Sequence, residues 1–251
     1  CIRDSNTAVG SDAATSLTTG VSNTFLGGEA AKFLTTGTNS IFIGQAAAKG
    51  VDGTPLTGTA NIVVGQAAGL VLQGAAANNT IVGRGAALKQ TTAIENVIVG
   101  ANAGIELVTG QRNTLVGNNA GANVTTSNNT FVGANGASGG CGEAMTTGDA
   151  NTILGGYNGN QGSLDIRTSS NNIVLSDGDG NPQLLINDAG DITNSVGNLD
   201  THSNQNAGFN FRKGNTNVFA GSNLTPITAN RIGNDGILID LRQADAREGN
   251  I

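Results

Sequence analysis

The sequence predicts an elongated all-β fold, a parallel β-solenoid or β-roll built from repeats of about 17 residues. Three observations predict it. A block of Asn, a polar or branched residue, two apolar residues and Gly recurs ten times; small residues keep step with it; and the aliphatic residues are spread evenly along the chain. With 39 Gly, no Trp, one Tyr and seven Phe in 251 residues, the chain cannot rely on one aromatic core. Burial must therefore be distributed along its length.

The repeated block ends at Gly in nine copies and at Ser in the tenth. The copies read NTAVG, NTFLG, SIFIG, NIVVG, NTIVG, NVIVG, NTLVG, NTFVG, NTILG and NIVLS, ending at residues 10, 27, 44, 65, 83, 100, 117, 133, 155 and 176. Successive ends lie 17, 17, 21, 18, 17, 17, 16, 22 and 21 residues apart, which indicates a period of 17 with a few insertions.

Each block predicts one short strand, because its apolar run is rich in β-branched residues. The third and fourth positions are never polar, although neighbouring side chains on a strand point to opposite faces. One coil encloses only one interior, so we expect partner chains to cover the other face. The residues expected to form the core and the packing between chains are Phe25, Leu26, Phe42, Ile43, Val64, Val82, Val99, Val116, Val132 and Leu154.

Small residues follow the block Gly by three and four positions, as at Ala30 and Ala31, and predict a tight corner in each unit. The Asn that opens the block is expected to stack from coil to coil and to bond its neighbours or the turn backbone. The unit is too short for the two helices of the common helical repeats and is dense in Gly, Asn and Thr, which favours β over a helical solenoid.

The period is lost after Ser176, so the sequence predicts three parts: a repeat shaft over 1–176, a hairpin-like transition over 177–194 and a small C-terminal β module over 195–251. Asp177, Asp179 and Asn181 alternate as in a calcium loop. However, Pro182 stands where such a loop requires Gly. We expect a hairpin turn here and no metal.

The C-terminal module holds an aromatic cluster beside two cations: Phe209, Phe211, Arg212 and Lys213. Its Phe residues can form the core of a small β domain, or the cluster can bind a ligand. Because loops on a rigid scaffold carry most binding functions, these four residues are the first candidates for receptor binding.

Composition argues against several functions. The net charge is −6 and the pI about 4.6, with cations scattered, so we expect no nucleic-acid ligand. No apolar stretch of 18 residues exists, so we expect no membrane insertion, and we expect no cofactor. Cys1 and Cys141 lie far apart in a linear fold, and no disulfide is expected between them.

The sequence does not favour an enzyme. The one histidine, His202, lies in a polar run beside Ser203 and Asp200 without other support for a triad. The acids of the repeats occupy different places in the unit, and a polysaccharide-cleaving groove needs paired carboxylates with aromatics. We expect no catalytic residues, while a pair formed between protomers stays open.

The repeat NTFLGGEAAKFLTTGTNSIFIGQAAAKG resembles the Asn-Thr-x-x-Gly, Ala-Gly and Thr-Thr-Gly repeats of phage tail fibres and related bacterial fibre proteins, over residues 6 to 176. SSNNIVLSDGDGNPQLLINDAGDI resembles the segment that follows such repeats, and NDGILIDLRQADAREGNI resembles the ending that precedes an endosialidase-type intramolecular chaperone. The resemblance implies a homotrimer in the virion that contacts other tail or baseplate proteins and binds a host polysaccharide or protein receptor. No chaperone catalytic motif is present.

Two other classes share part of the pattern. The head of a trimeric bacterial adhesin also stacks Gly- and Ala-rich repeats, at a shorter spacing, and a depolymerising tailspike is the enzymatic alternative. Ice-binding solenoids show flat Thr-x-Thr arrays, which several copies here lack. We therefore expect a structural and receptor-binding component of a tail fibre.

Overall fold

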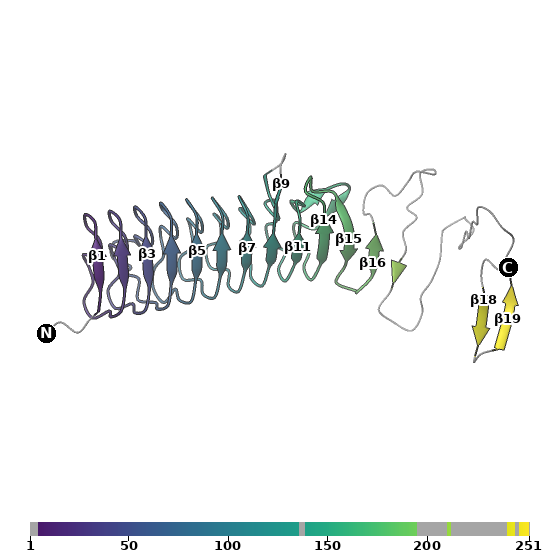
Figure 1. The fold of residues 1–251 in the computed structure, drawn as a ribbon, viewed down its shortest axis with the longest axis horizontal. Helices are drawn as coiled ribbons and strands as arrows, with labels where there is room; N and C mark the ends of the chain where they lie inside the picture. Colours follow the sequence, from purple (N-terminus) through teal and green to yellow (C-terminus); the bar gives the residue numbers. More distant parts are fainter. Residues whose placement is uncertain (1–4, 136–138, 195–209, 212–239, 244–245, 251) are drawn as a thin grey trace.

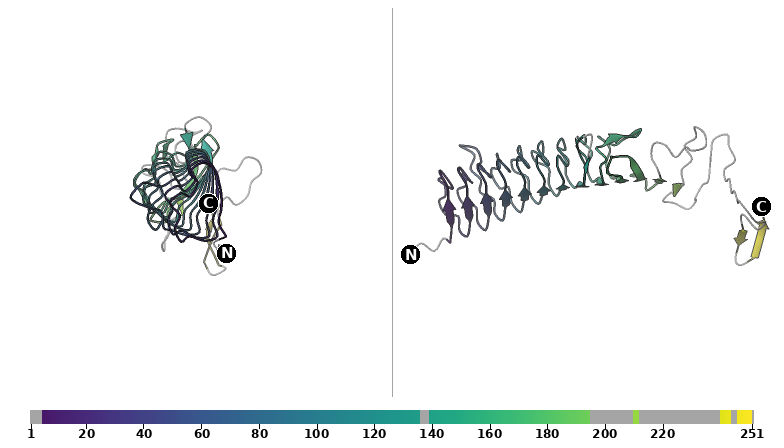
Figure 2. Two further views of the ribbon diagram at one scale, coloured as in Figure 1. Left: turned by 90° about the vertical axis from the view of Figure 1, so that its left-hand side faces the viewer. Right: turned by 45° about the horizontal axis from the view of Figure 1, so that its top comes forward.

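The computed structural model describes residues 5–135, 139–194, 210–211, 240–243 and 246–250. Its main feature is a parallel β-solenoid of about ten coils, in which successive coils stack along one axis and lay their strands side by side (Figure 1). Seen end on, the coils lie over one another (Figure 2). The predicted all-β parallel solenoid with turns of about 17 residues is confirmed.

Each coil gives one strand of three or four residues to a long sheet. Ten of its strands are parallel and follow the repeated blocks: β1 (Thr7–Val9), β2 (Thr24–Leu26), β3 (Ile41–Ile43), β4 (Ile62–Val64), β5 (Thr80–Val82), β6 (Val97–Val99), β7 (Thr114–Val116), β8 (Thr130–Val132), β11 (Thr152–Leu154) and β14 (Ile173–Ser176). Equivalent block positions pair without any shift, as in Phe25 opposite Phe42. At about 4.8 Å between strands, ten coils give a shaft on the order of 45 Å long.

The interior of the shaft is hydrophobic and made of stacked columns of one residue per coil. From β2 to β14 the third block position is buried, and Phe25, Phe42, Val63, Ile81 and Ile98 are fully buried. The rings of Phe25 and Phe42 stack with centroids 5.7 Å apart and planes 6° from parallel. The predicted small residues form a second column.

The Gly that closes each block is required by the stacking. At Gly100 the backbone has φ of 145°, and a Cβ atom there would overlap the carbonyl oxygen of Gly117 in the next coil. At the corner that follows, small residues such as Ala31 and Ala87 adopt the left-handed conformation with φ of 48° and 51°. Only a residue with little or no side chain fits where backbone meets backbone.

Three coils are longer than the rest, and their extra residues project from one edge of the shaft, between the block Gly and the next inward-facing aliphatic residue. The first contains an antiparallel bridge between Val51 and Thr54. The second carries β9 (Ala134–Asn135) and β10 (Gly139–Gly140), and the third carries β12 (Asn160–Gln161) and β13 (Leu164–Asp165).

After β14 the sheet continues with antiparallel strands. β15 (Pro182–Ile186) pairs with β14, β16 (Ile192–Asn194) with β15, and β17 (Asn210–Phe211) with β16. The hairpin turn expected around Asp177 lies between β14 and β15. A separate antiparallel pair is formed by β18 (Asp240–Gln243) and β19 (Ala246–Asn250).

Candidate functional site

The sequence-predicted receptor residues fall largely outside the described part of the chain. Phe209, Arg212 and Lys213 lie outside the described residues, as does His202. Of Phe211 only the backbone is described, which lies in β17 opposite Ile192 of β16. Receptor binding at this cluster stays a prediction.

The ten predicted packing residues divide into two groups in one chain. Phe25 and Phe42, at the third block position, are fully buried inside the coil. The other eight, at the fourth position, lie on the outer face of the sheet. They are partly or fully exposed: Leu26 to 47%, Leu154 to 42% and Val132 to 36%, while Ile43, Val64, Val82, Val99 and Val116 are intermediate.

This outer sheet face is uncharged along its whole length and mainly aliphatic. It consists of the second and fourth block positions, where six of the twenty residues are Thr and the others are Val, Ile or Leu. Nine of the exposed large hydrophobic side chains of the described residues lie on it: Val9, Leu26, Ile41, Ile62, Val97, Val132, Leu154, Ile173 and Leu175. A row of exposed aliphatic side chains of this length marks an interaction surface.

Beside the strands runs a buried ladder formed by the Asn that opens each block. The Asn96 Oδ1 accepts the backbone N–H of Asn113 at 2.9 Å, and the Asn96 Nδ2 donates to the carbonyl of Gly110 at 2.9 Å. Asn79 makes the equivalent bonds one coil earlier. The predicted stacking of Asn is thus observed, and its side chains are committed to the backbone rather than to a ligand.

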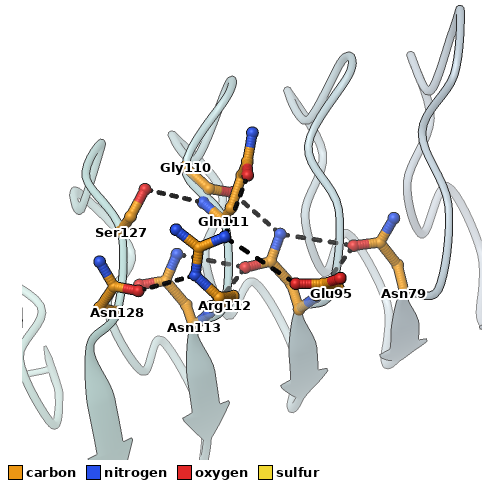
Figure 3. Close-up of polar contacts among 9 residues, drawn as sticks. Asn79, Glu95, Gly110, Gln111, Arg112, Asn113, Ser127 and Asn128 are labelled. Carbon is orange, nitrogen blue, oxygen red and sulfur yellow. Dashed lines mark hydrogen bonds and ion pairs between the residues drawn. The ribbon is translucent and has the colours of Figure 1, made fainter.

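A small polar cluster lies on the surface beside the ladder. The Arg112 Nε donates to Asn128 at 2.9 Å, while its Nη1 lies 3.9 Å from the Glu95 carboxylate (Figure 3). Glu95 and Arg112 are about half exposed. An exposed pair of this kind contributes little, and its geometry holds neither a buried charge nor a pocket.

An inward-facing aliphatic column was missed at the sequence level. It stands seven residues after the block Gly in the regular coils and later in the three long ones, and it contains Leu17, Leu34, Leu56, Leu72, Leu107, Val124, Met145 and Ile166. In the coil between Leu72 and Leu107 its place is taken by Gln90, which is fully buried. The spacing of seven from the block Gly could have revealed this column.

A surface cleft of about 380 Å³ lies beside the β12–β13 hairpin of the third long coil. It is lined by Asn123, Ala144, Thr146, Asp165, Arg167 and Thr168, which come from three successive coils. The Arg167 side chain and backbone N–H bond the Asp165 carboxylate and hold the pKa of that carboxyl below its ordinary value. Asp165 is therefore a carboxylate at neutral pH.

Two titratable groups lie in the interior near these loops. Burial raises the pKa of the Cys141 thiol to about 12, so the thiol stays protonated and unreactive in the folded shaft. Burial also raises the pKa of the Tyr157 phenol, whose hydroxyl donates to the Leu164 carbonyl at 2.9 Å. Both groups are structural, because neither reaches solvent.

Within the described ranges no three His, Cys, Asp or Glu side chains gather as they would around a metal ion. The same ranges contain no helix with the length and apolarity of a membrane span. No protein-family model, curated protein or solved structure matches this chain. The class of protein that the structure defines is therefore a parallel β-solenoid repeat protein.

Proposed function

We propose that this chain is a shaft segment of an oligomeric attachment fibre, a phage tail fibre that binds the host cell surface in the virion. The outer sheet face carries the proposal. It is uncharged and mainly aliphatic over all ten parallel strands, and one chain leaves it partly exposed. A face of this kind is covered in the working protein.

The partners that fit this face are two further copies of the chain. The face repeats every coil, about 4.8 Å, from one end of the shaft to the other, so its partner must be as long, as straight and as periodic. A globular partner would cover only a few coils. A second solenoid has the same face with the same spacing, and the resemblance to tail fibres implies three copies.

The loop edge supports an attachment role. A regular solenoid supplies reach, and its rigid coils hold the three projecting loops in place. Weak contacts to surface glycans then add up, because three copies present the same loops at once. The C-terminal cluster from Phe209 to Lys213 is a second candidate contact, and tail or baseplate proteins are the expected partners within the virion.

The test combines mass and binding. Light scattering on the full chain should give three times the 24.9 kDa of one protomer. The same sample should bind candidate host cells or their surface polysaccharide without shortening the polymer. A monomer would remove the structural basis of the proposal, and shortened polysaccharide would make a depolymerising tailspike the better description.

A further inference from the structure

The cleft on the loop edge lies beside the β12–β13 hairpin and is lined by residues of three successive coils. Asn123 comes from a regular coil, Ala144 and Thr146 from the coil that carries β9 and β10, and Asp165 and Arg167 from the coil that carries β12 and β13. Its volume of about 380 Å³ falls at the small end of the roughly 300–1,000 Å³ typical of small-ligand sites. One or two small ring units would fill it.

The wall of the cleft is held in place by the hydrophobic interior. Tyr157 is fully buried, and its hydroxyl bonds the carbonyl of Leu164 in the β12–β13 hairpin. The Ile166 N–H donates to the Gly159 carbonyl at 2.9 Å and closes the base of the same hairpin. The cleft is therefore formed before a ligand arrives, which lowers the entropy cost of binding.

The polar groups of the wall form a fixed, neutral pair. The Arg167 Nε and Nη2 donate to Asp165 Oδ1 and Oδ2 at 2.9 and 2.7 Å, and the two side chains are 45% and 50% exposed. The Thr146 hydroxyl donates to the Arg167 carbonyl at 3.2 Å, and a hydroxyl that donates can still accept a hydrogen bond. Carboxylate and guanidinium each retain further hydrogen-bonding capacity.

We propose that this cleft binds a neutral sugar unit of the host surface polysaccharide, through vicinal hydroxyls that donate to Asp165 and accept from Arg167 and Asn123. Each sugar hydroxyl is both a donor and an acceptor, which matches a wall that offers both acceptors and donors. A sugar acid fits less well, because its carboxylate would be repelled by Asp165 and would have to displace it from Arg167. The proposal rests on the attachment function above and assigns it a ligand class and a place.

The same column of the shaft supplies a matched control. Lys89 and Glu106 stand six residues after their block Gly, as Asn123 does, and the Lys89 Nζ bonds the Glu106 carboxylate at 2.6 Å. Their side chains are 52% and 37% exposed, close to those of Asp165 and Arg167. This pair lies in regular coils without an insertion. It reproduces the charges of the proposed site without the hairpin wall.

The experiment uses the full chain and saturation-transfer NMR with D-glucose, D-galactose and D-mannose, and with glucuronic and galacturonic acid. We expect a neutral hexose to bind more tightly than its uronic acid. Asp165→Ala and Asn123→Ala should each weaken binding at least tenfold, with Lys89→Gln unchanged. Because the Asn123 side chain belongs to a regular coil, Asn123→Ala tests binding even if Asp165→Ala perturbs the hairpin. Circular dichroism checks that both variants are folded.

Three results would overturn the proposal: neutral hexose binding that survives both cleft variants, preference for the uronic acids, or attachment to host cells without any hexose binding. In the last case the attachment function stands and the assignment of the cleft fails. If the unaltered chain bound neither host cells nor polysaccharide, the attachment function itself would be rejected.

Discussion

The Asn96 side-chain oxygen bonds both the backbone N–H and the side-chain amide of Asn113, at 2.9 and 3.2 Å, one coil further along the shaft. The Asn113 side-chain oxygen accepts the backbone N–H of Asn129 in the same way. Asn96 and Asn113 therefore tie their coils to the next, and each also bonds its own following turn. Since these groups are buried, a coil that lost its Asn would leave backbone donors and acceptors without partners.

Ser40 interrupts this ladder and offers a gain in stability. Its hydroxyl accepts the N–H of Asn61 at 3.1 Å but is too short to bond the turn carbonyl that Asn23 reaches at Gly37. We expect Ser40→Asn to add a bond to the equivalent carbonyl of Gly58 and to raise the free energy of unfolding by about 1 kcal/mol. Urea unfolding at fixed protein concentration measures it.

The matched control for that substitution is Asn96→Ser. It creates the same interruption in a regular coil and should lower the free energy of unfolding by about 1–2 kcal/mol. Equal stability of Asn96→Ser and the unaltered chain would show that the ladder adds nothing, and would contradict both predictions.

Gln90 is the second place where the core departs from its own pattern. It lies fully buried in the aliphatic column, and while its Nε2 donates to Asn79 at 3.0 Å, its Oε1 has no hydrogen-bond partner. We expect Gln90→Leu to stabilise the shaft by about 1 kcal/mol, because it removes an unsatisfied acceptor and Asn79 still accepts from Asn96. The midpoint of thermal unfolding should rise.

The reverse substitution one coil away, Leu107→Gln, places the same amide in an aliphatic site. It should cost at least about 2 kcal/mol. A Gln90→Leu variant that melted below the unaltered chain would mean that the Gln90 amide bonds outweigh its unsatisfied oxygen.

The block Gly is predicted to be irreplaceable. Gly100→Ala would force an alanine to φ of 145° and push its Cβ into the Gly117 carbonyl. We expect a loss of at least about 3 kcal/mol, from backbone strain and overpacking together. Gly178→Ala is the control, since a Cβ there meets nothing within 4 Å. Circular dichroism with urea compares the two, and similar midpoints would refute the steric argument.

Inner and outer strand positions should respond differently to charge. Phe42→Asp places a carboxylate in the hydrophobic interior and should prevent folding of the coil. Val99→Asp lies on the outer sheet face, so the solenoid should fold but fail to associate. Circular dichroism reports the first result and light scattering the second. If Val99→Asp remained an oligomer of unchanged heat stability, the outer face would not be the contact between copies.

The sequence was sufficient to predict the coil, but not to predict where the extra residues of the long coils project from it. Spacing and alternation placed Phe25 and Leu26 on opposite faces, and the structure puts Phe25 inside and Leu26 outside. The lengths of the long coils were also evident. What the spacing did not give was where the extra residues leave the coil, because Leu56 and Met145 had not been recognised as members of one inward column.

The cleft could not be predicted from the sequence, for a related reason. Asn123 and Arg167 lie 44 positions apart in the sequence and line the same cleft because the coils stack. No local pattern in the sequence encodes that arrangement. Tyr157, which anchors the hairpin, is the single Tyr of the chain and therefore shows no periodicity.

The turn that follows the last coil should depend on acid. The Asp177 Oδ1 accepts the N–H groups of Asp179 and Asn181 at 3.1 and 2.8 Å, and its Oδ2 accepts the Asn181 side-chain amide at 3.0 Å. These bonds, with those of Asn181 the largest, hold the pKa of this carboxyl below its ordinary value in the folded state. The carboxylate therefore stabilises the turn above the pKa of the unfolded chain, and that stabilisation is lost as pH falls through the lower folded value.

We expect the backbone N–H of Asn181 to be protected from hydrogen exchange near neutral pH and to lose protection only when the pH falls below the ordinary pKa of an aspartate, as Asp177 takes up its proton. Asp177→Asn should lose the carboxylate bonds and be independent of pH over the same range. Asp188→Asn is the control, because it removes an acid from the neighbouring turn between β15 and β16 and should leave the Asn181 profile unchanged. An Asn181 profile that kept its acid transition in Asp177→Asn would assign the titration to another group.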